Sequence, residues 1–183
     1  MNKKTLWITR TAALTALLVV LQASTAALGS TLVTGTVVNL LLIISVMTCG
    51  AASGLSVAVL SPVLAKLIGI GPLWGLIPFI AAGNLALAAV WLAVGNRNRR
   101  WEPRYAPQIT ALALAAAAKS LVLYLGVVKL ALPLFSGLTA AQAAAIAHMF
   151  SAPQLVTAVL GGLLALPLLA PLKKAMERGA RQN

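Results

Sequence analysis

Residues 109–132 read ITALALAAAAKSLVLYLGVVKLAL, a nearly apolar stretch long enough to cross the hydrocarbon core of a bilayer as one helix. Lys119 lies near its middle. A lysine at that depth costs about 2.5–3.5 kcal/mol on insertion scales and normally has a partner. The only two acidic residues, Glu102 and Glu177, lie outside every membrane-length apolar segment. We therefore expect the counter-charge to come from a molecule outside this chain, such as a bound anionic small molecule.

The composition is that of an integral membrane protein. Hydrophobic residues make up 61% of the chain and charged residues only 9%, and the mean hydropathy is +0.98. The 183 residues have room for about six spanning helices with short loops. We therefore expect one domain, residues 1–183, without a soluble catalytic domain. Cys49 is the single cysteine, so an internal disulfide is excluded.

Gly and Pro clusters and charge runs divide the chain into apolar segments. The predicted spans are residues 6–28, 34–48, 52–68, 76–95, 107–130 and 150–171. All should be helices, because lipid-exposed backbone must satisfy its own hydrogen bonds. The first exceeds the length of a signal-peptide core and is predicted to be a span. The short junction at residues 48–53 predicts a tight helical hairpin. The fold class is thus an all-α bundle of six transmembrane helices.

Basic residues gather in three places and predict the orientation. The clusters are Lys3, Lys4 and Arg10; Arg97, Arg99, Arg100 and Arg104; and Lys173, Lys174, Arg178 and Arg181. The positive-inside rule puts all three in the cytoplasm, so both termini should be inside a multi-pass cell-membrane protein. The formal net charge of +12 is explained in this way, and no nucleic-acid partner is expected.

Polar side chains within the predicted spans fall mainly in the outer half and middle of the bilayer, and the inner half contains hardly any. This asymmetry favours a cavity open to the outside. Ser151, Gln154 and Thr157 share one helix face, and His148 is expected at the outer mouth. The candidate substrate-binding residues are Lys119, Asn84, Gln154, Asn39, Gln22, Ser151, Thr157 and His148. Any one amide alone could instead form an interhelical hydrogen bond. Lys66 and Lys129 are predicted to snorkel near helix ends.

The chain lacks the motifs of an enzyme or a self-powered pump. It has no Gly-x-x-x-x-Gly-Lys-[Ser/Thr] motif, no paired intramembrane carboxylates and no Asp/Glu relay. We therefore expect no catalytic residues, no metal and no cofactor, and a binding subunit energised by other proteins. Two alternatives remain. One is a structural or assembly membrane protein without a ligand, and the other is a small membrane enzyme using Lys119 and His148.

Several motifs together resemble a known family. Ala12 and Ala16 form an Ala-x-x-x-Ala step that lets another helix approach closely. Further segments are Ser61-Pro62 to Gly69-Ile70-Gly71-Pro72, Pro78-Phe79 with Gly83-Asn84, and Phe150-Ser151 to Gln154-Leu155 with Gly161-Gly162. With the six short helices, this pattern resembles the substrate-binding S component of an energy-coupling factor (ECF) transporter, of the pantothenate-type or an uncharacterised subfamily.

The resemblance implies a membrane receptor for a vitamin or related micronutrient. Its partners would be a transmembrane coupling protein and two cytoplasmic ATPases, so that ATP is used by the partners. Ala12 and Ala16 would dock on the coupling protein. The binding cavity would lie near the outer face, closed by the loops at residues 29–33 and 69–75, and the whole subunit would tip in the membrane to release its substrate. Pantothenate fits the unpaired lysine, as do several other vitamins.

Overall fold

The computed structural model describes residues 2–95 and 105–181, and every regular element within them is helical. The elements are α1 (Lys3–Ala26), α2 (Thr31–Leu67), η1 (Trp74–Leu76), α3 (Ile77–Val90), η2 (Trp91–Gly95), α4 (Ala106–Leu123), η3 (Tyr124–Ala131), η4 (Leu132–Leu134), α5 (Ala140–Met149) and α6 (Ala152–Arg181). The prediction of an all-α protein is confirmed. The basic loop residues Arg97, Arg99, Arg100 and Arg104 lie outside the described residues.

Five helices in the described ranges are long and apolar enough to cross a membrane. They are Lys4–Ala26, Thr31–Leu67, Trp74–Gly95, Ala106–Leu134 and Ala140–Ala175. The second of these covers two of the predicted spans, residues 34–48 and 52–68. At 1.5 Å per residue, a straight helix of 37 residues would be about 55 Å long, far more than a hydrocarbon core of about 30 Å.

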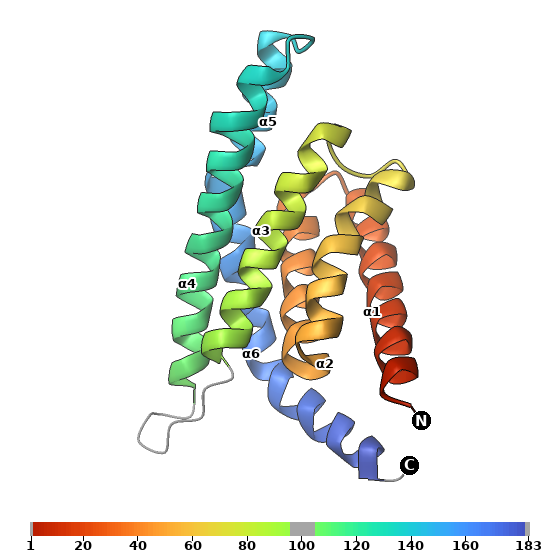
Figure 1. Ribbon diagram of the computed structural model, residues 1–183. Coiled ribbons are helices and arrows are strands. Elements are labelled where there is room, and N and C mark those ends of the chain that lie inside the picture. Colours follow the sequence, from red (N-terminus) through yellow and green to blue (C-terminus); the bar gives the residue numbers. More distant parts are fainter. Residues whose placement is uncertain (1, 96–104, 182–183) are drawn as a thin grey trace.

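Helix α2 is not straight, because the chain changes direction at Gly50. This residue has φ 83° and ψ −179°, which are not helical values. A Cβ added at Gly54 would collide with the backbone of Val46, although residues eight apart in a straight helix are about 12 Å apart. Residues 31–49 (the first arm) and 51–67 (the second arm) therefore lie side by side (Figure 1). The tight hairpin predicted at residues 48–53 is found here.

Replacing Gly50 by alanine tests this turn. Its backbone region is essentially restricted to glycine, while a Cβ there would meet no atom within 4 Å. The cost should therefore come from the backbone alone, and we expect Gly50→Ala to lower the free energy of unfolding by about 1–3 kcal/mol. Chemical unfolding in detergent measures the change. Gly137→Ala is the control, since a Cβ at Gly137 would also meet no atom within 4 Å but Gly137 has no positive φ. Equal losses of stability in both variants would contradict a strained turn at Gly50.

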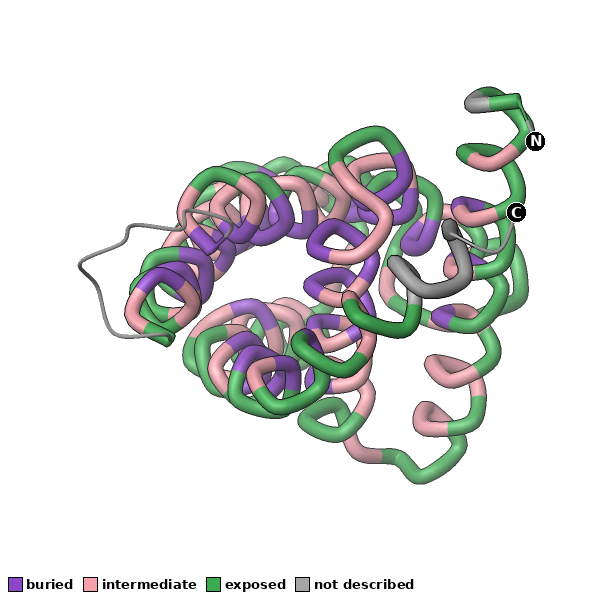
Figure 2. Tube along the Cα trace, turned by 90° about the horizontal axis from the view of Figure 1, so that it is seen from below, coloured by how far each residue is buried: buried purple, intermediate pink, exposed green. Residues whose placement is uncertain are grey.

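Helix α2 is the centre of the bundle, packing against α1, α3 and α6, while α4 packs against α3 and α6. Buried residues face the interior when the bundle is seen from below (Figure 2). Glycines set two of the closest contacts. A Cβ at Gly161 of α6 would meet Asn39 Cβ at 2.7 Å and the backbone nitrogen of Leu40 at 2.9 Å, and one at Gly83 of α3 would meet Leu123 Cγ at 2.7 Å. These contacts bring polar residues of different helices within hydrogen-bonding distance.

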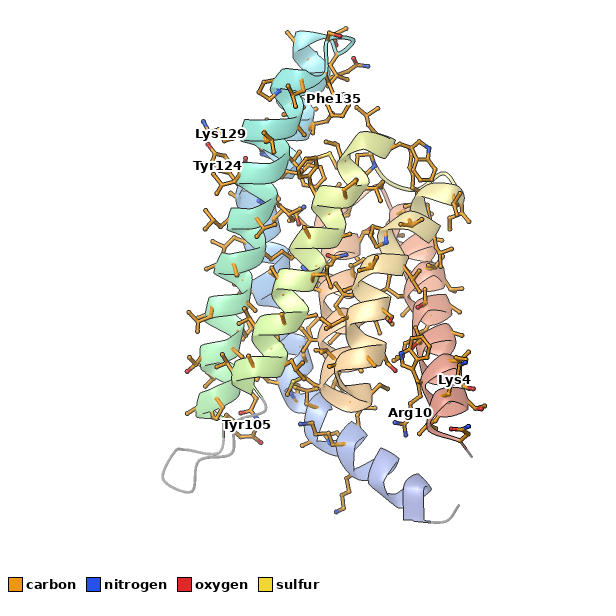
Figure 3. The ribbon with its side chains drawn as sticks, viewed as in Figure 1. Lys4, Arg10, Tyr105, Tyr124, Lys129 and Phe135 are labelled. Carbon is orange, nitrogen blue, oxygen red and sulfur yellow. The ribbon has the colours of Figure 1, made fainter. Side chains whose placement is uncertain are left out.

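The two ends of the bundle differ. Both chain termini lie at the lower end in Figure 1, whereas α5 and the η3–η4 segment project beyond the other helices at the upper end. Lys4, Arg10 and Tyr105 mark the lower end and Phe135 the upper end (Figure 3). The short helix α5 begins at Ala140. Its N-cap is Thr139, which forms a reciprocal capping box with Gln142.

Candidate substrate-binding site

Lys119 lies within α4 with only 4% of its surface exposed. Its Nζ donates one hydrogen bond of 2.6 Å to Asn39 Oδ1 and a second of 2.7 Å to Asn84 Oδ1. Asn39 belongs to the first arm of α2 and Asn84 to α3, so the lysine joins three helical segments. Both distances are short, as expected when the donor is charged.

Asn39 is held by α6. Its Nδ2 donates to Thr157 Oγ1 at 3.3 Å, and the Thr157 hydroxyl donates to the Gln154 carbonyl at 3.2 Å. Asn39 is 0% exposed and Thr157 is 2% exposed, so an unsatisfied polar atom here would cost about 1–3 kcal/mol. Since the amide nitrogen is engaged by α6, the amide oxygen is directed to Lys119.

The orientation of Asn84 follows from a gap in the hydrogen bonding of the second arm. Pro62 has no N–H, so the carbonyl of Ala58, four residues earlier, lacks its usual helical donor. Asn84 Nδ2 donates to that carbonyl at 3.4 Å. With its nitrogen used in this way, Asn84 presents its oxygen to Lys119.

The network satisfies hydrogen bonds but supplies no negative charge. Hydrogen bonds to a charged group are worth about 1.5–3 kcal/mol each, so two of them offset much of the roughly 2.5–3.5 kcal/mol that the lysine costs at this depth. Lys119 therefore has hydrogen-bond partners within the chain, and the expectation of a counter-charge from outside the chain stays a prediction. These bonds do not neutralise the positive charge of Lys119, because both partners within the described ranges are neutral amides.

A small cavity lies beside this network. Its volume is about 130 Å³, room for roughly four water molecules at ~30 Å³ each. The polar residues lining it are Gln22, Ser61, Asn84, Lys119 and Gln154. We call it the core cavity. Its lining comes from α1, both arms of α2, α3, α4 and α6.

A larger cavity of about 630 Å³ lies at the upper end. It is lined by the connections at residues 29–31 and 70–73, by Lys66 of the second arm, and by Gln142, Ala145, Ile146 and Met149 of α5. We call it the upper cavity. Its volume falls within the ~300–1,000 Å³ typical of small-molecule sites, whereas the core cavity is below that range.

The two cavities lie one above the other. On α1, Ala26 lines the upper cavity and Gln22, one turn deeper, lines the core cavity. The second arm repeats this step, with Lys66 in the upper cavity and Pro62 in the core cavity. A molecule in the upper cavity could therefore extend one group toward Lys119.

A family model described as ECF transporter, substrate-specific component, matches residues 7–172. The chain belongs to this family. No curated protein and no solved structure is significantly similar to it. As an ECF substrate-specific component, the protein is a membrane subunit of an ECF importer that binds a small-molecule substrate and associates with ECF partner proteins, and it is not an enzyme. The enzyme and ligand-free assembly alternatives are thereby set aside.

Four of the eight candidate residues named from the sequence of this ECF component line neither cavity: His148, Ser151, Asn39 and Thr157. His148 is exposed on α5 and lines neither of them. Ser151 is also absent from their linings, and its hydroxyl donates to the carbonyl of Ala147 at 2.6 Å. Asn39 accepts a hydrogen bond from Lys119 and donates one to Thr157. The other four candidates, Lys119, Asn84, Gln154 and Gln22, line the core cavity.

Sequence reasoning assigned no binding role to Lys66 or Ser61. Lys66 was predicted to snorkel, yet it lines the upper cavity. Ser61 is 1% exposed and lines the core cavity, and its hydroxyl has no hydrogen-bond partner among the described residues. A serine next to a proline inside a span was the available signal, because such a position leaves a backbone carbonyl to be satisfied and space beside the helix.

The predicted asymmetry of polar groups concerns the amides and the ammonium. Buried hydroxyls also occur in the lower half of the bundle, at Thr11 and Thr15 of α1 and at Ser45 and Ser53 on either side of the Gly50 turn. Hydroxyls can bond to the carbonyl of the preceding helical turn, as Ser45 does to Leu42. Small buried hydroxyls thus occur at this end of the bundle too, and the predicted asymmetry stays a prediction about the amides and the ammonium.

The alanine step of this ECF component faces a different side of the bundle. Ala12 and Ala16 are exposed and line an open apolar groove of about 1040 Å³ between α1 and the second arm of α2. Gln22, on the same helix, faces the core cavity instead. Helix α1 thus has one side in the substrate-binding region and another available to a neighbouring helix.

Proposed function

We propose that this ECF substrate-specific component captures a vitamin or related micronutrient with an anionic group from outside the cell. The observation that carries the proposal is the buried Lys119 ammonium, which has two neutral amide partners and lines a cavity beneath a larger one. An anion in the core cavity would supply the missing negative charge. Lys119, Asn84, Gln154 and Gln22 would contact it, while Asn39 and Thr157 orient the lysine.

The proposed topology has six membrane crossings with both termini in the cytoplasm. The two arms of α2 count as separate crossings, since each has the length of a short span. Lys4 and Arg10 lie at the same end as both termini (Figures 1 and 3), which supports a cytoplasmic lower end under the positive-inside rule. The upper cavity would then open to the outside of the cell membrane.

The partners in this proposal are a transmembrane coupling protein and two cytoplasmic ATPases. Ala12 and Ala16 would dock on the coupling protein, and support comes from their exposure in the open groove. The connections at residues 29–33 and 69–75 would close over the bound substrate. Hydrolysis of ATP by the partners would then tip the subunit and carry the cavities to the cytoplasm.

Native mass spectrometry of the protein purified in nanodiscs tests the proposal. We expect a small anionic molecule to be released when the protein is denatured. Titration of the emptied protein with pantothenate, biotin and nicotinate, compared with neutral riboflavin, should show binding of a carboxylate vitamin. A protein that carries no small molecule and binds none of these anions, or one that captures only riboflavin, would contradict the proposal.

A further inference from the structure

Two buried serine hydroxyls near Lys119 lack a hydrogen-bond partner among the described residues, at Ser61 and Ser120. Their surroundings differ. Ser61, on the second arm of α2, lines the core cavity, and Ser120, on α4, does not. A buried polar atom without a partner destabilises a protein unless something else satisfies it. Ser61 therefore places a buried donor without a partner in the wall of a space that a ligand can occupy.

Lys119 offers a second donor in the same cavity. Two of its three ammonium protons are used by Asn39 and Asn84, and the third has no acceptor among the described residues. One ammonium and one hydroxyl in a single small cavity match the two oxygens of a carboxylate. The charges also match, because this lysine is the only charged side chain among the cavity's described lining residues. A phosphate dianion would need more positive charge than one ammonium supplies.

The volume of the core cavity limits what accompanies the carboxylate. About 130 Å³ holds the carboxylate and a short stem, but not a molecule of vitamin size. The rest of the ligand would have to lie in the upper cavity, whose residues on α1 and the second arm are one turn above those of the core cavity. The two cavities thus divide the ligand into a small charged end and a larger body.

We propose that Ser61 is a substrate-contacting residue that selects a carboxylate at the end of a short stem, its hydroxyl donating to one carboxylate oxygen while Lys119 donates to the other. This inference rests on the proposed function and deepens it. Asn84 and Gln154 line the remaining sides of the same cavity. A neutral amide in place of the carboxylate would lose the charge interaction with Lys119 and would present an N–H group to one of two donors.

Ser61→Ala tests the proposal, with butyrate as the probe and butyramide and inorganic phosphate as comparisons. We expect butyrate to bind the emptied wild-type protein better than either comparison, and Ser61→Ala to weaken butyrate binding on the order of tenfold. The empty variant should be as stable as the wild type or more so, since an unpartnered hydroxyl is removed. A purely structural role for Ser61 would instead lower the stability. Titration calorimetry and thermal unfolding in nanodiscs give the two readouts.

Ser120→Ala is the matched control, because it removes the other unpartnered hydroxyl outside the cavity, and it should bind butyrate like the wild type. Equal butyrate binding by Ser61→Ala and the wild type, with binding lost in Lys119→Met, would overturn the role of Ser61 and leave the proposed function intact. Preference for phosphate or butyramide would overturn the carboxylate assignment. Absence of any bound anion in native mass spectrometry as well would reject the proposed function itself.

Discussion

Lys119→Met is expected to weaken capture of the anionic substrate on the order of a hundredfold while leaving the protein folded. Methionine keeps an unbranched side chain of similar length, so the packing of α4 changes little. Removing one member of a buried charged pair typically costs about 2–5 kcal/mol of binding free energy. Titration of the emptied protein with the molecule that co-purifies with the wild type, in nanodiscs, measures the loss.

The stability of the empty Lys119→Met protein separates a ligand contact from a structural role. The variant loses two hydrogen bonds and leaves the oxygens of Asn39 and Asn84 without the donor seen in the structure. It also loses a charge that costs about 2.5–3.5 kcal/mol at membrane depth. The two effects oppose each other, so little net change in stability is expected. Lys129→Met is the control, since Lys129 is exposed and its ammonium lies over the ring of Tyr124, 5.5 Å from the centroid. Unchanged substrate affinity in Lys119→Met would reject the lysine as a contact.

Gly161→Val should give the largest loss of stability, together with a loss of binding. A Cβ at this position would lie 2.7 Å from Asn39 Cβ and 2.9 Å from both the nitrogen of Leu40 and the carbonyl oxygen of Thr36. Two of these obstacles are backbone atoms, which cannot rotate away. Overpacking costs about 1–3 kcal/mol, and we expect the upper end of that range. Displacement of α6 from the first arm would also remove Thr157 from Asn39 and so disturb the orientation of Lys119.

Unfolding free energies and substrate affinity, measured on the same Gly161→Val preparation, check this prediction. Leu163→Val is the appropriate control, because it places the same β-branched residue on α6 at a position that is 50% exposed. It should cost no more than the helix propensity difference, a few tenths of a kcal/mol. If both valine variants behave alike, the close approach of α6 to α2 is not what holds the site together.

The helices could be predicted from hydropathy because each apolar segment must form its own backbone hydrogen bonds in lipid. The Gly50 turn was also predictable in position, since two short spans with little chain between them can only fold back sharply. The ends of the later helices were harder to predict from the sequence. The span predicted at residues 107–130 changes to a π-helical stretch at Tyr124–Ala131 and is followed by a 3₁₀ turn at Leu132–Leu134. Such local changes of helical pitch have no clear sequence pattern.

The polar residues of the candidate site could be picked out from the sequence, but their contacts with one another could not. Lys119, Asn39 and Asn84 are each conspicuous as polar residues in apolar segments, but their meeting depends on the rotation and spacing of three helices. That spacing is set by glycines such as Gly83 and Gly161, whose partners a single sequence does not reveal. Ser61 escaped notice because a serine in a membrane helix usually bonds to its own backbone. Only the structure distinguishes the serines that do not, Ser61 and Ser120.

Pro62 carries a consequence for how this protein tolerates change. A residue with an N–H at position 62 would make the second arm a more regular helix and restore the missing donor to Ala58. Asn84 would then share its acceptor with a backbone N–H, and its amide, held less firmly, could rotate by 180° and turn its nitrogen toward the ammonium. A more regular α2 would thus leave the Asn84 amide of α3 less well oriented toward Lys119. At this proline, helical regularity and substrate binding favour different residues.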